Sequence, residues 1–364
     1  MLCYCRCGLT NAVTGLCGAG LTNSAVICLS GQHPTTEDLA GSFQEAYGSE
    51  VAGSFSKYTK RVLDWSTIEV DLRQAFREAT SPPQGVSLLE IPTNILYHSD
   101  DEDLQRPGAK VYSPDELRSQ LDPRQIDRTV GLLLAAKRPL IAGGDGIFWS
   151  DAAAELTELA ELTHTPVYCR RAGQGAMDEA NSLAIRGAWK KPFTGTANLV
   201  LAVGFRFWSG EKFGQPPTWT DKATYIQVDT DPQRVGWHVP AEVGIVGDPK
   251  LVLRQIIDRI KEVRADFSAK AGSPWIEQMG EVRANYEKMI AERAAANHDA
   301  HPIHPDRLTK DLVSVLDDDA SLVVDSFTLR GYASQWFTAH HMGQVVDAGP
   351  LAPVGHGVGM GIGA

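Results

Sequence analysis

Short apolar runs alternate with helix-like spacing along the first hundred residues. The runs at Ala25–Leu29, 55–62 and Gly85–Ile91 have the length of buried strands, and Pro92 stops the last of them. Between them, apolar residues recur at helical intervals from Ile68 to Ala79. Strands that alternate with helices predict a parallel sheet covered by helices, so this part of the chain is expected to be α/β.

The same alternation returns after a polar stretch at residues 99–112, which is expected to be a linker, and Ser113-Pro-Asp-Glu is typical of a helix start. Helices are predicted at Ile126–Ala136 and Ala152–Leu162. Strands of this second α/β unit are predicted at Pro139–Ala142, Pro166–Tyr168, Asn198–Val203, Thr224–Asp229 and Gly244–Val246.

The remainder of the chain begins with a charged stretch at Leu251–Ala296, which is expected to be mostly helical with an interruption at Gly272-Ser-Pro274. A further unit opens near Pro302, with a helix from Asp306, a strand at Leu322–Val324 and a Gly-rich end. The predicted fold is therefore α/β, with parallel-sheet three-layer domains over residues 1–105, 113–265 and 302–364 and a helical linker at 266–301.

Composition narrows the classes of function. The chain has 34 Lys and Arg against 45 Asp and Glu, a net charge of −11, and no basic stripe, which argues against a nucleic-acid partner. No apolar run has the roughly 20 residues of a membrane helix, so a cytoplasmic protein is expected. Cys3, Cys5 and Cys7 lack a fourth ligand at usable spacing, and no metal site is predicted from them.

Candidate ligand-binding residues follow four predicted strands of the second unit. Gly143 and Gly144 follow one strand, Gly204 and Arg206 the next, Asp229 ends a third, and Asp248 follows the fourth. Open parallel sheets bind nucleotides at the carboxyl ends of their strands, where backbone amides meet phosphate and carboxylates meet ribose. A plain tight turn is the alternative interpretation of Gly143-Gly-Asp-Gly146.

Glycine recurs at every second position from Gly355 to Gly363, which predicts a glycine-lined turn entering a closely packed helix. His356 within it is interpreted as a structural side chain rather than a catalyst. Lys190-Lys191-Pro192 is interpreted as a solvated corner. The sequence contains no Gly-x-Ser-x-Gly elbow, phosphate-loop lysine motif or His-Glu-x-x-His pattern, which argues against the familiar hydrolases and kinases.

Taken in order, these strings resemble the thiamine-diphosphate-dependent enzymes of the acetolactate synthase, 2-hydroxyacyl-CoA lyase and oxalyl-CoA decarboxylase group. Residues 8–15 are similar to the tail of that family's Gly-Pro-Gly-x-x-Asn segment, and Leu29–Gln32 and Ser42–Glu45 follow at family spacing. Residues 138–144, 204–206 and 227–232 are similar to its central domain. Residues 347–364 resemble the opening of its diphosphate-binding domain.

The resemblance implies what each domain does. Residues 1–105 would be the later part of a pyrimidine-binding domain, 113–265 a complete Rossmann-like central domain, and 302–364 the first part of a diphosphate-binding domain. It also implies thiamine diphosphate and Mg²⁺ as cofactors, a 2-oxo acid or acyl-CoA substrate, and a homodimer or homotetramer. FAD or ADP would bind the central domain through Gly143, Gly144, Gly204, Arg206, Asp229 and Asp248.

Residue by residue, Val354, Gly355 and Gly349 match positions that hold thiamine diphosphate, and Gln32, Phe43 and Gln44 match the active-site wall. The family's activating glutamate and its Mg²⁺ ligands have no match in the sequence. We therefore expect a fragment, truncated at both ends and inactive alone, of an enzyme that makes or cleaves C–C bonds next to a carbonyl. Carboligase and lyase both stay open, as does the alternative of a catalytically inactive remnant that binds FAD or ADP.

Overall fold

The computed structural model of the chain describes residues 2–3, 6–99, 118–119, 121–326 and 328–364. The chain divides into two compact units, Met1–Leu117 with Ala348–His356, and Arg118–Asp347 with Gly357–Ala364. The predicted helix start at Ser113 and most of the predicted linker lie outside the described residues. Within the described part of the chain, no helix combines the length and the apolar character that crossing a membrane requires.

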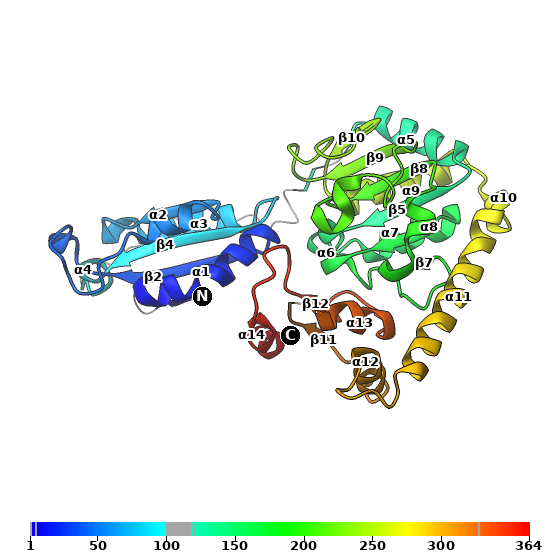
Figure 1. Cartoon of the computed structure of the whole chain (residues 1–364). Helices are drawn as coiled ribbons and strands as arrows, with labels where there is room; N and C mark the ends of the chain where they lie inside the picture. The colour runs from blue at the N-terminus through cyan, green and yellow to red at the C-terminus, as the bar shows by residue number, and fades with distance from the viewer. Residues whose placement is uncertain (1, 4–5, 100–117, 120, 327) are drawn as a thin grey trace. The chain divides into compact units, whose positions relative to one another are not determined.

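The first unit is a four-stranded parallel sheet in the order β1-β2-β4-β3 (Figure 1). Val86–Pro92 is almost entirely buried, because it lies between two neighbouring strands and under helices. Leu9 and Leu16 on α1 pack against Cys28, Val86 and Leu88 of the sheet. The elements are β1 Leu2–Cys3, α1 Arg6–Leu21, β2 Val26–Gln32, α2 Gly48–Gly53, β3 Tyr58–Arg61, α3 Ile68–Thr80, β4 Val86–Pro92 and α4 Thr93–Leu96.

The second unit contains a six-stranded parallel sheet in the order β10-β9-β8-β5-β6-β7. Its strands are β5 Pro139–Gly143, β6 Val167–Cys169, β7 Ala184–Ile185, β8 Leu199–Val203, β9 Thr224–Asp229 and β10 Val243–Val246. Its helices are α5 Pro123–Ala135, α6 Asp145–Trp149, α7 Ala153–Thr163, α8 Lys191–Thr194 and α9 Pro249–Glu262.

Successive residues of the central strands enter two separate cores. Ile141 joins a cluster with residues of α5, α7 and α9. Leu140 and Ala142 join the aromatic cluster on the other face, which contains Phe193 and Trp219. Because side chains alternate across a strand, apolar residues at every position bury both faces of this sheet. The result is a helix–sheet–helix layering, as Figure 1 shows for the green part of the chain.

The second unit continues into a helical region and a small two-stranded parallel sheet, β11-β12. Trp275 anchors the long helix α11 on the central domain, since its Nε1 donates to the Pro139 carbonyl at 2.9 Å. The elements are α10 Ser268–Ala271, α11 Pro274–Ala296, α12 Pro305–Val313, β11 Leu322–Val324, α13 Thr328–Trp336, β12 Val345–Asp347 and α14 His356–Gly363.

These elements confirm the α/β prediction, and every strand predicted in the central unit is present within two residues of its expected bounds. The interruption at Gly272-Ser-Pro274 is also present, between α10 and α11. The Gly-rich end forms the expected turn and helix, with Gly349 and Gly355 at positive φ before α14. Strands β1, β7 and β12, of two or three residues each, are not predicted by the sequence pattern.

Candidate active site and nucleotide edge

Two glycine turns at the carboxyl ends of β5 and β8 lie backbone against backbone. Gly204 has φ +54°, and a Cβ on it would lie 2.4 Å from the Gly146 Cα. A Cβ on Gly144 would lie 2.2 Å from the Gly204 carbonyl oxygen. The amides of Gly144 and Gly146 donate to the Val203 and Gly204 carbonyls, at 3.1 and 3.2 Å. The glycines thus allow the two turns to pack closely. The amides of Gly144 and Gly146 donate within the protein and are therefore not available to a ligand.

Charged side chains surround the same edge of the sheet. Burial raises the pKa of the Asp145 carboxyl, and the positive charge of Arg206 acts in the opposite direction. Burial also raises the pKa of Asp229, whose Oδ1 accepts from the Asp231 amide at 2.9 Å. The pKa of Arg206 is lowered, first by burial and then by Arg234. A buried guanidinium between carboxylates has the chemistry to hold a phosphate or ribose group.

Asp248 caps a helix at this edge. It is the N-cap of α9, where its Oδ1 accepts from the Leu251 amide at 3.1 Å, and Arg118 lies 3.5 Å away. Such a cap satisfies one of the free amides of the helix start. The structure therefore brings Gly143, Gly144, Gly204, Arg206 and Asp229 to one sheet edge, while their assignment to FAD or ADP stays a prediction.

In the first unit, Gln32 ends β2 and is buried. Its Nε2 donates to the Glu90 carboxylate, which also accepts from the Ser49 amide at 3.0 Å. Phe43 and Gln44 lie in the following loop, where Phe43 is 87% exposed and Gln44 has φ +60°. Gln32 and Phe43 thus differ sharply in exposure, and their role as an active-site wall stays a prediction.

The loop that carries Phe43 is held by its own carboxylates. Glu45 accepts hydrogen bonds from the amides of Leu39, Gly41 and Ser42, at 2.7, 2.9 and 3.2 Å. Asp38 pairs with Arg61 through both oxygens, at 2.6 and 2.7 Å. The Arg61 hydrogen bonds lower the pKa of Asp38 to about 2. These contacts give the exposed Phe43 a defined attachment.

The Gly-rich segment presents an apolar side chain between two turns. Val354 is 86% exposed and lies next to Gly355, which has φ +89°. Gly349 has φ +63° and approaches Thr22, so both glycines need the left-handed conformation. His356 donates from Nδ1 to the Pro353 carbonyl at 2.8 Å, in keeping with a structural side chain.

Comparison with known proteins identifies the central unit. Residues 126–256 match the family model described as "Thiamine pyrophosphate enzyme, central domain". Residues 126–256 are thus similar to the central domain of the thiamine pyrophosphate enzymes. It is 28% identical to a probable acetolactate synthase large subunit of Methanococcus aeolicus, over 98% of this chain and 61% of that protein. It is 31% identical to an acetolactate synthase of Arthrospira platensis, over 69% of this chain and 45% of that protein.

A 2-hydroxyacyl-CoA lyase of Arabidopsis thaliana is 26% identical, over 87% of this chain and 55% of that protein. The resemblance drawn from the sequence motifs is thereby confirmed at the level of the family. The chain spans about 61% of the length of its Methanococcus aeolicus relative.

Lys190 is largely buried. The predicted solvated corner is wrong for it, because the Lys190 side chain is only 14% exposed and its ammonium pairs with the carboxylate of Glu211. Glu211 is fully buried and also accepts from Tyr168 and Trp219, at 2.9 and 3.0 Å. A buried lysine with a carboxylate partner is a structural pair rather than a surface charge.

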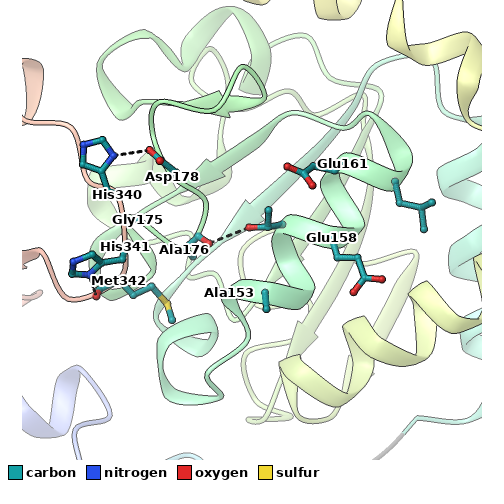
Figure 2. A pocket seen from close by; sticks show the side chains of 12 residues that line it. Ala153, Glu158, Glu161, Gly175, Ala176, Asp178, His340, His341 and Met342 are labelled. Atoms are coloured by element: carbon teal, nitrogen blue, oxygen red, sulfur yellow. Dashed lines mark hydrogen bonds and ion pairs between the residues drawn. The ribbon is translucent and has the colours of Figure 1, made fainter. Parts of the chain in front are cut away.

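A separate hollow lies beside α7 and contains none of the predicted site residues. Figure 2 shows this groove of about 790 Å³, with His340 directed at Asp178 across one side, 3.0 Å apart. A Cβ on Gly175 would lie 2.3 Å from the His341 carbonyl oxygen, so the glycine allows the 340–342 segment to pack closely.

Proposed function

We propose that this protein acts in a thiamine-diphosphate- and Mg²⁺-dependent reaction that makes or cleaves a C–C bond next to a carbonyl. The observation that supports the proposal most strongly is the central-domain match, together with acetolactate synthase relatives that align over 98% of the chain. The substrate class is a 2-oxo acid or an acyl-CoA, after the names of those relatives. A homodimer or homotetramer is part of the same proposal.

Several residues fit the cofactor. Gly355 has open space where a Cβ would lie, whereas Gly349 packs against Thr22, and the exposed Val354 supplies an apolar surface against which a ring can pack. When bound, thiamine diphosphate supplies a carbon nucleophile that attacks the substrate carbonyl. For Mg²⁺ the fit is lacking among the described residues, where no three His, Cys, Asp or Glu side chains are grouped to hold a metal.

Because no residue of the sequence matches the family's activating glutamate, we propose that the 364-residue chain does not turn over alone. The test expresses this chain and, beside it, the longest product of the reading frame that contains it. Each is given thiamine diphosphate and Mg²⁺ with pyruvate or a 2-hydroxyacyl-CoA, and products are identified by mass spectrometry. Turnover by the longer product alone is expected. Turnover by neither would overturn the proposed reaction, and turnover by the 364-residue chain would overturn its inactivity.

We also propose that the edge formed by Gly204, Arg206 and Asp229 binds FAD or ADP. The buried guanidinium of Arg206 among carboxylates supports this assignment. A yellow protein on purification would identify FAD, and a rise in melting temperature with ADP would identify the nucleotide. Nucleotide binding by both products with turnover by neither would favour an inactive nucleotide-binding protein. An Arg206→Gln variant with unchanged ADP affinity would contradict the assignment.

A further inference from the structure

A charged cavity of the Arg118–Asp347 unit borders the edge formed by Gly204 and Asp229, since Arg171 of its lining and Arg206 of that edge both lie over the Trp208 ring. It measures about 320 Å³ and is enclosed by the carboxyl end of β6, the short sheet β11-β12 and α13. Three arginines line it, Arg170, Arg171 and Arg330, together with the carboxylates Glu179 and Asp347. A cavity with this many guanidinium groups has the chemistry of an anion site.

Two of these five charges are satisfied by residues outside the cavity lining. Arg170 pairs with Glu211 at 2.7 Å, and Glu179 lies 3.5 Å from Arg186. The Glu179 carboxylate also accepts from the Ala339 amide at 3.0 Å. The pair of Glu179 and Arg186 is neutral as a unit, whereas Arg170 shares Glu211 with Lys190. Neither contact therefore supplies negative charge that would offset a further cation in the cavity.

The remaining three charges do not balance. Arg171 lies 3.3 Å from one oxygen of Asp347, and Arg330 pairs with the other oxygen. Two guanidinium groups therefore share one carboxylate, which leaves one positive charge in excess. Asp145 also acts on Arg171, but Arg206 acts on Asp145 more strongly than Arg171 does. A negative charge inside the cavity would offset this excess.

Both the backbone conformation and the burial of Arg171 are energetically unfavourable. Its backbone has φ +57°, a conformation that non-glycine residues adopt rarely and that often marks a functional residue. Its side chain is 11% exposed, and its Nε is buried with no hydrogen-bond partner among the described residues. The guanidinium lies 3.9 Å from the centroid of the Trp208 ring, which fixes its plane. A buried donor without an acceptor is destabilising unless a ligand satisfies it.

We propose that this cavity binds a small oxyanion, a carboxylate or a phosphate group, through Arg171 and Arg330. The planar guanidinium of Arg171 can pair with two oxygens at once, and its unused Nε provides the donor for one of them. The oxyanion takes up the excess positive charge that Asp347 leaves. The inference does not depend on thiamine diphosphate chemistry, and it is tested by binding rather than by turnover.

The test titrates the full 364-residue chain with acetate and, separately, with inorganic phosphate, at an ionic strength held constant with chloride. Saturable binding is followed by tryptophan fluorescence, for which Trp208 is a built-in reporter, and by calorimetry. Tighter binding of acetate would identify a carboxylate ligand, and tighter binding of phosphate a phosphate group. Absence of saturable binding of either anion would overturn the proposal.

Two variants with opposite expected effects connect the binding to this cavity. Arg171→Gln should weaken it about ten-fold or more, since the charge and the guanidinium fork are both lost. Asp347→Asn should strengthen it about ten-fold, since the competing carboxylate is removed. Arg124→Gln is the matched control, because that side chain is 90% exposed and lies elsewhere. Equal affinities in the Arg171 and Arg124 variants, or weaker binding in Asp347→Asn, would overturn the assignment.

Discussion

Replacing Glu211 by Gln should destabilise the Arg118–Asp347 unit far more than a surface substitution would. Glu211 is fully buried and is the shared partner of two cations, Arg170 and Lys190, whose side chains are 16% and 14% exposed. The substitution keeps the shape but removes the negative charge, and its single carbonyl oxygen can accept from only one of Tyr168 and Trp219, which donate to different oxygens of Glu211. Two cations would then remain together in a largely buried aromatic environment.

The size of the effect follows from the cost of an unpaired buried charge. Removing one member of a buried ion pair costs about 3–5 kcal/mol. For a unit of this size each kcal/mol lowers the melting temperature by about 2–4 °C, so a fall of about 6–20 °C is expected. Burial already lowers the pKa of Lys190, and Glu211 opposes that shift. In the variant Lys190 should lose its proton more easily, and the destabilisation should therefore shrink as the pH rises.

The assay is thermal unfolding of the full chain followed by near-UV circular dichroism, because Trp219 lies at the site. Glu262→Gln is the control, since that side chain is 70% exposed and its pair with Arg259 is worth about 0–1 kcal/mol. Lys190→Met should cost less than half as much as Glu211→Gln, since the pair of Arg170 and Glu211 survives. Equal melting temperatures for the Glu211 and Glu262 variants, or a larger loss in Lys190→Met, would refute the reasoning.

Three further predictions concern other parts of the chain. Gly204→Ala should lower the free energy of unfolding by about 3 kcal/mol or more, because it combines positive φ with a Cβ 2.4 Å from the Gly146 Cα. Gly236→Ala is the control and should cost about 1 kcal/mol, because that glycine has positive φ but open space around it. Chemical denaturation measures both losses, and equal losses would contradict the contact with Gly146. Burial lowers the pKa of Lys270 to about 8, so a large share of this amine is unprotonated and nucleophilic near pH 8. Lys270 should therefore react with an acylating reagent faster than the exposed Lys288 does. Peptide mass spectrometry measures both rates, and equal rates would contradict the prediction. The Arg61 hydrogen bonds lower the pKa of Asp38 to about 2 from 3.8, so the loop's stabilisation by this carboxylate is present above about pH 4 and is lost as the pH falls through about 2. The protection of the amides of residues 39–42, measured relative to their intrinsic exchange rates, should fall over that range. Asp38→Asn should lower this protection already at about pH 5, where the Glu45 hydrogen bonds to these amides are still present, and equal protection in the two proteins there would contradict this.

The strands of the central sheet could be predicted from the sequence because both faces of each strand are buried. The predicted strand Asn198–Val203 lies within one residue of β8, since Leu199–Val203 is a continuous apolar run, the signature of a strand covered on both sides. Strand β7, Ala184–Ile185, is two residues long and therefore too short to have a period. The residues at the strand ends were predictable for a related reason, since parallel strands place their carboxyl ends at one edge.

The charged contacts could not be predicted in the same way. Lys190 and Glu211 are 21 positions apart, and Arg171 and Asp347 are 176 positions apart, so no local pattern connects either pair. Arg171 does carry one usable signal, because it follows strand β6 just as Arg206 follows β8. The exposure of Phe43 could not be predicted either, because an aromatic residue in a loop has the same sequence pattern whether it is buried or exposed.

Helix α11 connects the central domain to α12, and its length determines how its two contact regions are oriented relative to each other. Trp275 and Met279 near the beginning of α11 pack on the central domain, and Ile290 and Ala294 are the buried residues near its end. There Arg293 pairs with Asp306 of α12, at 2.5 and 2.8 Å. One residue inserted between these two contact regions would turn the second by about 100° and advance it by about 1.5 Å, whereas seven inserted residues would nearly restore its direction. Helix α11 should therefore tolerate changes of length only in steps of about two turns, because other changes would turn Arg293 away from Asp306 of α12.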